Sequence, residues 1–375
     1  MSLLLSVAQP ILASLLADVG PAIKARGTRP ILAHVLIQAE ADRLTLTGTD
    51  TGLTLRSAAT AHVKTPGAVT VDYAKLKGIV GSLSAEADIL IEQTPARVIV
   101  KAGRSRFVLS SLDPDSFPVA AEPEGGDSLE LDGAEFLAMA NAVKHAMGVA
   151  DVKYYLNGML LQVHDTGLTA VATDGHRLAK AGLTIAHGLP ALDVIIPRES
   201  LLAALRWCQG PIRIDLGTSQ WRLTAGERVI VSKLVDGKYP DYARVIPDYA
   251  ALPGEAVLER EELLAAIKRV ALCSHEQFKG IELLLPGDGL TLKARNTQQD
   301  EAEEAVATEV VKPMAVRIGC AYPYLEDVLN ATRAARVRLH HGREDKQMVI
   351  VPADQDGDRI ETVDPPLWVI MPMLI

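Results

Sequence analysis

A short polar run in the middle of the chain, Thr173-Asp174-Gly175-His176-Arg177, carries the residue types best suited to chemistry. Asp174 stands two residues before His176, as a carboxylate that orients a general base could, and Arg177 could hold an anion. The run follows an alternating apolar stretch that begins at Leu168, and Asp-Gly is a frequent turn sequence. We therefore expect the cluster at the corner of a hairpin.

Catalysis by this cluster is one interpretation, but the rest of the sequence gives it little support. No Gly-x-Ser-x-Gly nucleophile motif accompanies Asp174 and His176, and a single histidine in a turn is most often structural. The phosphate-binding motif Gly-x-x-x-x-Gly-Lys-Ser/Thr is absent as well, which argues against an ATP-driven protein of that kind. We predict a protein that is not an enzyme.

Metal and cofactor sites are not indicated either. Asp354–Asp358 suggests a calcium loop, but its glycine is misplaced and the expected twelfth-position glutamate is missing, so we predict a solvated turn between strands. His340-His341 has no companions at metal-ligand spacing and predicts a surface strand. Cys208, Cys273 and Cys320 are odd in number and far apart, which favours free thiols over disulfides or a zinc site.

The segment before the polar run recurs along the chain. Segments with a Leu-Thr opening and an Asp or Asn close are found at Leu44–Asp50, Leu168–Asp174 and Leu290–Asn296. Their spacing of about 124 and 122 residues is that of whole domains and not of a short repeat. Linkers rich in Pro and small or acidic residues put boundaries near 125 and 250. We predict three similar domains, 1–125, 126–250 and 251–375.

Each predicted domain contains two helices among short antiparallel strands, which makes an α+β fold. Apolar residues at spacings of three and four predict the helix pairs Pro10–Val19 and Tyr73–Leu83, Gly133–Lys144 and Arg198–Trp207, and Arg260–Ala271 and Tyr322–Ala331. Alternating β-branched runs between them predict the strands.

Composition and charge limit the class of protein. A length of 375 residues with 48% hydrophobic residues supports two or three folded domains. The apolar start lacks the basic residues and cleavage site of a signal peptide, and Gln9-Pro10 interrupts it, so we predict an early strand and an amphipathic helix. No run reaches the roughly eighteen apolar residues of a membrane span, and we expect a cytoplasmic protein.

The net charge of −9 argues against a general nucleic-acid binder unless the charges are segregated.

Several strings spread over the whole chain are specific enough to suggest a family. They are Asp151–Leu160, Ala172–Leu178, Asp236–Tyr242, Ser274–Gly280, Glu301–Glu304, Asp327–Asn330 and Met371–Met373. Together they resemble the bacterial DNA polymerase III beta subunit, the replicative sliding clamp. The resemblance implies a head-to-tail homodimer whose three-domain subunits close into a ring of six similar domains. Duplex DNA would pass through the hole without sequence specificity, with helices lining the hole and sheets outside.

The resemblance also implies partners and a task. An ATP-dependent clamp loader would place the ring on DNA, and the ring would tether the DNA polymerase III catalytic subunit. Processivity would then come from topology and not from affinity or catalysis, and no cofactor would be needed. A clamp-like adaptor that binds partner peptides without sliding is the alternative.

On the DNA side, the resemblance implies Arg26, Lys153, Tyr154, Tyr155 and Arg198, and Lys24 in the loop after the first predicted helix is a candidate beside them. Other basic residues on or beside the predicted helices are further candidates: Arg29, Lys75, Lys77, Lys144, Arg206, Lys268 and Arg269. For each of them alone, a solvated surface charge is an equal alternative. Ala74 and Glu199 depart from the family, where basic residues are common. A sliding protein needs only weak phosphate contacts, and an acidic outer surface would keep DNA off the wrong face.

A partner-peptide pocket is implied where the second and third domains meet. Its lining would be Leu156, Thr173, Gly175, His176, Arg177, Leu178, Pro240, Val245, Met348, Val369, Met371, Pro372 and Met373, and it would take a short Leu/Phe-bearing segment of a polymerase, a loader or a repair protein. The almost wholly apolar tail Trp368–Ile375 must be covered by something, and methionines suit an adaptable groove. A terminal strand buried in its own domain is the alternative. Leu374 departs from the family, which commonly has Arg there.

The dimer contact is implied in the same way. Phe107 and Leu109 of the first domain would meet Leu272 and Cys273 of the third. Lys75 would face the acidic run that contains Asp300, Glu301, Glu303 and Glu304. Because exposed ion pairs are worth only about 0–1 kcal/mol each, the apolar contacts should supply most of the closure.

Overall fold

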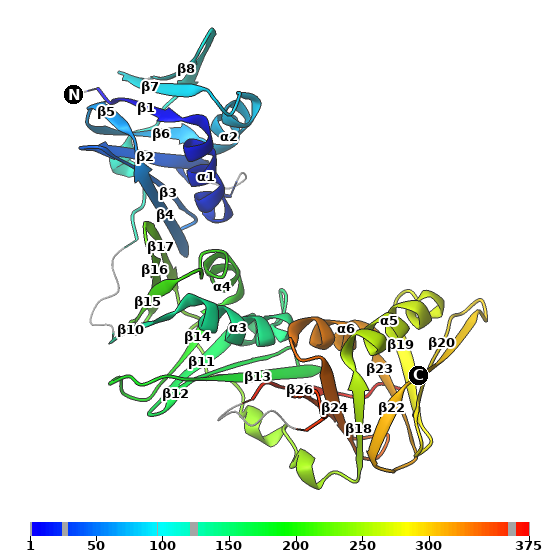
Figure 1. Cartoon of the computed structure of the whole chain (residues 1–375). Coiled ribbons are helices and arrows are strands. Elements are labelled where there is room, and N and C mark those ends of the chain that lie inside the picture. Colours follow the sequence, from blue (N-terminus) through cyan, green and yellow to red (C-terminus); the bar gives the residue numbers. More distant parts are fainter. Residues whose placement is uncertain (1, 25–28, 96, 121–126, 359–364, 375) are drawn as a thin grey trace. The chain divides into compact units, whose positions relative to one another are not determined.

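The computed structural model describes residues 2–24, 29–95, 97–120, 127–358 and 365–374. The chain forms two compact units, one made of Met1–Gly133 and Glu199–Leu234, the other of Ala134–Arg198 and Val235–Ile375. Each unit contains one large and one small sheet, and Figure 1 labels their elements. Within the described ranges, no helix combines the length and the apolar character needed to cross a membrane.

The first unit has an eight-stranded and a five-stranded sheet. The order of the large sheet is β10 (Asp127–Asp132), β15 (Pro211–Leu216), β16 (Gln220–Ala225), β17 (Arg228–Lys233), β4 (Leu53–Thr60), β3 (Arg43–Thr49), β2 (His34–Glu40) and β6 (Gly67–Asp72). The small sheet runs β5 (His62–Thr65), β1 (Leu4–Ala8), β7 (Asp88–Thr94), β8 (Arg97–Ala102) and β9 (Ser105–Ser110). Helix α1 (Gln9–Val19) contacts β4 and α2 (Tyr73–Ser82), and α4 (Arg198–Ala204) is the third helix.

The second unit has a nine-stranded and a four-stranded sheet. The order of the large sheet is β14 (Leu192–Pro197), β11 (Gly158–His164), β12 (Gly167–Thr173), β13 (Arg177–Thr184), β26 (Leu367–Ile370), β25 (Met348–Ala353), β24 (Arg336–His341), β18 (Gly254–Glu259) and β22 (Thr308–Lys312). The small sheet runs β21 (Glu301–Val306), β20 (Leu290–Arg295), β19 (Gly280–Leu285) and β23 (Val316–Ala321). Its α-helices within the described residues are α3 (Gly133–Val143), α5 (Arg260–Val270) and α6 (Tyr322–Ala331), and the short 3-10 helix η4 (Lys144–Ala146) follows α3.

The six predicted helices are confirmed, and five of them end within two residues of the expected positions. The exception is α4, which ends at Ala204 and not at Trp207. Trp207 donates its indole N–H to the buried carboxylate of Asp18 at 3.1 Å. The backbone N–H of Trp207 bonds to the carbonyl of Ala204, three residues back, so the chain tightens there to place the indole in the core.

The three Leu-Thr segments are strands, as predicted: β3, β12 and β20 each pair with the next strand along the chain, β4, β13 and β21. Each unit joins strands that are far apart in sequence. In the first, β4 pairs with β17; in the second, β13 pairs with β26. Elements of the predicted central domain belong to both units, and the boundaries near 125 and 250 stay a prediction.

One expectation is wrong: His340 and His341 do not form a surface strand, because both are almost completely buried in β24. Strand β24 lies inside the large sheet between β25 and β18. The ring of His340 packs edge-on against Tyr249, with 5.2 Å between centroids. The ring of His341 fills the space beside Gly254, where an added Cβ would come within 2.1 Å of it. Asp354–Asp358 is a mostly exposed turn, as predicted.

Candidate functional site

The polar run from Thr173 forms the corner of the β12–β13 hairpin, as the sequence predicts. The hydroxyl of Thr173 donates to the carbonyl of Arg177 at 2.6 Å, and one carboxylate oxygen of Asp174 accepts the backbone N–H groups of His176 and Arg177 at 2.9 and 3.1 Å. Gly175 sits at φ +88°, a conformation that costs L-residues with a side chain about 1–2 kcal/mol. The side chains of this run therefore build the turn itself.

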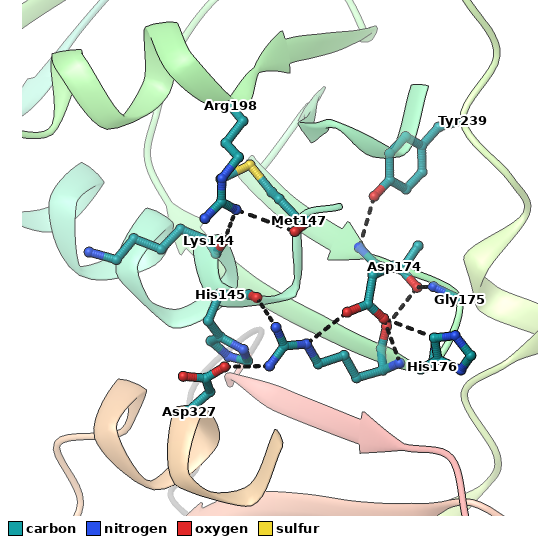
Figure 2. Close-up of polar contacts among 11 residues, drawn as sticks. Lys144, His145, Met147, Asp174, Gly175, His176, Arg198, Tyr239 and Asp327 are labelled. Carbon is teal, nitrogen blue, oxygen red and sulfur yellow. Dashed lines mark hydrogen bonds and ion pairs between the residues drawn. The ribbon is translucent and has the colours of Figure 1, made fainter. Parts of the chain in front are cut away.

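Arg177 is held from several sides. Its Nε donates to Asp174 at 3.0 Å, Nη1 to Asp327 of α6 at 2.5 Å, and Nη2 to the carbonyl of His145 at 2.5 Å. Its guanidinium also stacks 4.5 Å from the ring centroid of Tyr324, another α6 residue. Figure 2 shows Asp174, Asp327 and the His145 carbonyl converging on this group. Two carboxylates thus contact one partly buried guanidinium.

The proposed acid–base pair does not form in this arrangement. His176 is exposed, and the contact described between it and Asp174 runs through the histidine backbone and not through its ring. Asp174 holds the turn and one side of Arg177. These contacts give Asp174 and Arg177 structural tasks.

The apolar tail is a strand that emerges at this corner. Strand β26 lies between β13 and β25, with Leu178 opposite Val369. Beyond the strand, the N–H of Met371 donates to the carbonyl of His176 at 2.9 Å, and the N–H of Met373 to that of Gly319 at 2.8 Å. Trp368 is 1% exposed, whereas Met371 is 39% exposed and Leu374 completely so. The tail is therefore both a buried terminal strand and, past Ile370, an apolar surface.

The thirteen predicted pocket residues lie within the second unit and divide into interior and surface. Leu156, Leu178 and Val369 belong to one buried cluster with Tyr239, and Met348 is buried as well. Exposed residues are Gly175, His176, Pro240, Val245 and Met371; partly buried ones are Thr173, Arg177, Pro372 and Met373.

Hydrogen bonds connect the loop that carries Pro240 and Val245 to the rest of the site. The phenol oxygen of Tyr239 accepts the N–H of Thr173 at 3.0 Å, and burial raises the pKa of this phenol. The side-chain amide of Gln347 donates to the carbonyl of Val245 at 3.1 Å. The loop is thereby fixed against both the hairpin turn and β25.

Three residues around Arg177 were not predicted: His145, Tyr324 and Asp327. Tyr324 and Asp327 are three residues apart and so share one face of α6. That spacing could have shown that the two side chains lie on one helix face, but it does not indicate which arginine they contact. Burial, with the nearby Arg177 charge, lowers the pKa of His145 to about 4, and neither of its ring nitrogens has a described hydrogen-bond partner.

The residues expected to face DNA differ in how free their charges are. The ammonium of Lys24 pairs with Asp50 at 2.8 Å, and Arg26 lies outside the described residues. Arg198 donates to the carbonyls of Lys144 and Met147, both at 3.3 Å, where α3 ends (Figure 2). Lys24 and Arg198 therefore already make polar contacts within the chain.

The other expected DNA-side residues are more open. Lys153 is exposed and Tyr154 is 57% exposed. Tyr155 packs against the buried cluster, with its ring centroid 5.7 Å from that of Tyr154. Lys75 and Lys77 on α2 are also exposed. Solvent-facing charge is thus available at Lys153, Lys75 and Lys77.

The residues expected at a dimer contact lie at open sheet edges. Strand β9, with Phe107 and Leu109 half-buried, is an edge of the five-stranded sheet, and β21 is an edge of the four-stranded sheet. Near β21, Leu272 is 84% exposed and Cys273 is half-buried. Each acidic side chain of β21 has a partner within the chain: Glu301 with Arg295, Glu303 with Lys293, and Glu304 with Arg269.

Comparison with known proteins identifies the family of the chain. Residues 3–121, 130–241 and 243–363 match the family models of the N-terminal, central and C-terminal domains of the DNA polymerase III beta subunit. The beta sliding clamp of Pseudomonas aeruginosa is 36% identical, over 94% of this chain and 94% of its own length. That of Escherichia coli K12 is 35% identical, over 86% and 89%.

Solved structures agree with the sequence comparison. A crystal structure of the Pseudomonas aeruginosa DNA polymerase III subunit beta superimposes with a TM-score of 0.90 at 35% identity, covering 99% of this chain and 100% of that one. Another, with griselimycin bound, gives a TM-score of 0.91 at 34% identity, covering both chains completely. The chain therefore has three clamp domains and belongs to the DNA polymerase III beta subunit family, the DNA sliding clamps of bacterial replication.

Proposed function

We propose that this clamp works as a head-to-tail homodimeric ring around duplex DNA. The observation that carries the proposal is the pair of open strand edges, β9 and β21, which leave backbone groups free to pair with another chain. The two edges carry exposed charges of opposite sign, although the carboxylates of β21 also pair with Lys293 and Arg295 of β20. Exposed Arg104 and Arg106 belong to the β8–β9 hairpin, whereas Glu301 and Glu303 are exposed on β21. In the ring, β9 of one subunit would pair with β21 of its partner.

In this proposal the ring has no catalytic role. Helices line the hole, and exposed cations such as Lys75, Lys77 and Lys153 hold phosphates weakly. Because Lys24 and Arg198 already make polar contacts within the chain, retention of the clamp on DNA depends more on closure of the ring than on charge. An ATP-dependent loader would open the ring and place it on DNA.

The proposed partner site is the surface around the β12–β13 turn and the end of β26. Met371 and Val245 expose apolar side chains there, 39% and 40% accessible, beside a rigid turn. A short peptide with Leu and Phe side chains would cover them. The DNA polymerase III catalytic subunit, the loader and repair polymerases would bind through such a segment.

The proposed ring can be tested by comparing how long the clamp stays on circular and on linear DNA. The clamp, loaded by its cognate loader, should stay on nicked circular DNA and slide off after linearisation. The Leu272→Asp variant should run as a monomer on a sizing column and lose retention on the circle. A matched control, Val311→Asp, puts the same charge on a 42%-exposed valine of β22 and should behave as wild type. Equal loss of the wild type from both templates would overturn sliding and favour an adaptor.

Truncation tests the partner site. Deleting residues 371–375 should abolish binding of the end-capped peptide Ala-Leu-Asn-Leu-Phe-Gly, because it removes the exposed apolar surface beyond β26. The dimer should remain, since β9 and β21 are untouched. Unchanged peptide affinity in the truncated protein would refute the assignment of this surface.

A further inference from the structure

A cavity of about 900 Å³ lies in the first unit, whereas the expected partner site lies in the second. Its walls come from four parts of the chain: one face of α1, the second half of β4, the segment 206–211 after α4, and the β16–β17 turn. The first two belong to the N-terminal family match and the last two to the central one. Small-molecule sites in proteins have volumes of roughly 300–1,000 Å³. The cavity is therefore large enough to hold a small molecule between these elements.

The apolar part of the cavity wall is aliphatic. Ile11 of α1 is 38% exposed, and Leu15, four residues further along the same face of the helix, is buried. Ala58 of β4 and Pro211 add further apolar surface. An aliphatic ligand body would remove this surface from water, which favours binding.

The buried carboxylate that lines the cavity already has its hydrogen-bond donors. Asp18 accepts from the hydroxyl of Ser57 at 2.8 Å, from the indole N–H of Trp207 at 3.1 Å and from Nε of Arg228 at 2.8 Å. The three donors come from β4, the segment after α4 and β17. These bonds hold the walls of the cavity together, and they leave Asp18 little capacity to bind a cationic ligand.

The arginines that line the cavity keep unused donors within the described part of the chain. Arg228 donates through Nε alone of its five N–H groups, and its side chain is 42% exposed. Arg206 is exposed, and its described bond, to the carbonyl of Ala17, is long at 3.5 Å. The second lining carboxylate, Glu227, pairs with Arg43. The cavity thus offers guanidinium N–H groups that a ligand carboxylate could satisfy.

We propose that this cavity is a binding site for a small amphipathic carboxylate. The aliphatic body of the ligand packs on Ile11 and Leu15, and its carboxylate accepts hydrogen bonds from Arg206 and Arg228. The site goes beyond the proposed function, since it depends neither on the ring nor on the partner surface. A ligand bound there contacts both the N-terminal and the central clamp domain, so it should raise the melting temperature of the clamp.

Two probes and two substitutions test the site. Octanoate and octan-1-ol have the same aliphatic body, but only octanoate is charged; both are titrated into the full-length clamp by calorimetry at low ionic strength. Ser14→Trp fills the cavity from an exposed position on α1, and Arg206→Met removes one guanidinium. The matched controls are Ala74→Trp on α2 and Arg97→Met on β8, two exposed positions that do not line the cavity.

The wild type should bind one octanoate per chain and should bind octan-1-ol at least about tenfold more weakly, because the alcohol cannot accept charge-assisted hydrogen bonds. Arg206→Met should weaken octanoate about three- to tenfold and leave octan-1-ol within about twofold. Ser14→Trp should abolish binding of both probes. The two controls should match the wild type, and thermal melts should show every variant folded.

Three results would overturn the proposal. If Ser14→Trp binds octanoate with wild-type affinity, the ligand occupies another part of the protein. If the wild type binds the alcohol as tightly as the carboxylate, the two arginines do not select an anion. If the wild type binds neither probe, the cavity is not a site for this class of ligand.

Discussion

Two hairpin turns of this clamp have almost the same hydrogen bonds but different surroundings. In the turn Thr49–Leu53, Thr49 donates to the carbonyl of Leu53 at 3.0 Å, and Asp50 accepts from Gly52 and Leu53 at 2.9 and 2.8 Å. The turn Thr173–Arg177 repeats these bonds with Thr173 and Asp174. The strand beside each hairpin in the sheet also makes an equivalent bond. The N–H of Lys233 donates to the carbonyl of Gly52, and the N–H of Met371 donates to the carbonyl of His176, both at 2.9 Å.

The two turns differ in what lies beside them. The second oxygen of Asp50 pairs with Lys24, whose side chain is 59% exposed, and the adjoining strand ends in the exposed Lys233. The second oxygen of Asp174 pairs with the partly buried Arg177, and the adjoining strand ends in the apolar Ile370, followed by Met371. A repeated turn is thus a scaffold, and the proposed partner site arises from the residues around one copy.

Removing the turn carboxylates should have the largest effect. Asp174→Ala and Asp50→Ala each lose two charge-assisted hydrogen bonds from backbone N–H groups and one ion pair, and each should lower the free energy of unfolding by about 3 kcal/mol in urea denaturation. Only Asp174→Ala should also weaken peptide binding, by tenfold or more, because it releases Arg177. If Asp50→Ala weakened the peptide equally, the two turns would not differ in function.

The next largest effect should be on the pH dependence of stability, because a partly buried histidine, His145, lies beside the turn Thr173–Arg177. Burial, together with Arg177, lowers the pKa of His145 from 6.5 to about 4. Between pH 6.5 and about 4 this histidine is protonated in the unfolded chain but neutral in the native one, so its contribution should lower the stability by roughly 2–3 kcal/mol by pH 4 and change little below that pH.

The control for this titration is His145→Phe, which keeps an aromatic side chain in place and removes the titrating group. The pKa values of His34 and His341 are lowered as well, mainly by burial, and their contributions should persist in the variant. Identical pH profiles of wild type and variant would show that His145 does not carry this part of the loss.

Exchanging the residues with positive φ should have a smaller effect. Gly175 has φ +88°, whereas the matching position holds Thr51 at φ +79°. Gly175→Thr should destabilise the clamp by about 1–2 kcal/mol, since a β-branched residue is strained there. Thr51→Gly should stabilise it by less than about 1 kcal/mol, because relieved strain is offset by the greater freedom of unfolded glycine. Paired denaturation curves measure both, and equal signs would contradict the strain argument.

Lys24→Met should have the smallest effect. The hydrogen bond with Asp50 raises the pKa of Lys24, but the pair is open to solvent and should contribute less than about 1 kcal/mol. Although burial opposes it, hydrogen bonds from Lys24 and the turn lower the pKa of Asp50, so that pKa should rise in the variant. An NMR titration of the Asp50 carboxylate checks this, and an unchanged pKa would count against the ion pair.

Much of the fold followed from local patterns. Helices such as α6 were predicted with their bounds, since apolar residues at spacings of three and four are a pattern within one element. The end of α4 was not, because the Trp207 side chain is drawn into the core by Asp18, far away in sequence. The burial of His340 and His341 was missed for a related reason: a strand pattern does not say how many strands cover it.

By itself, the sequence determined the Thr-Asp turn and its repetition, because the bonds that the Thr and Asp side chains make to close the turn join residues within five positions of one another. The sequence also indicated that the apolar tail is buried by other parts of the protein or by a partner. Only the tertiary structure decided that Arg177 faces Asp327 and that Arg198 reaches the carbonyls of Lys144 and Met147. A guanidinium takes whichever acceptors the packed fold brings within hydrogen-bond reach, and no spacing along the chain specifies them.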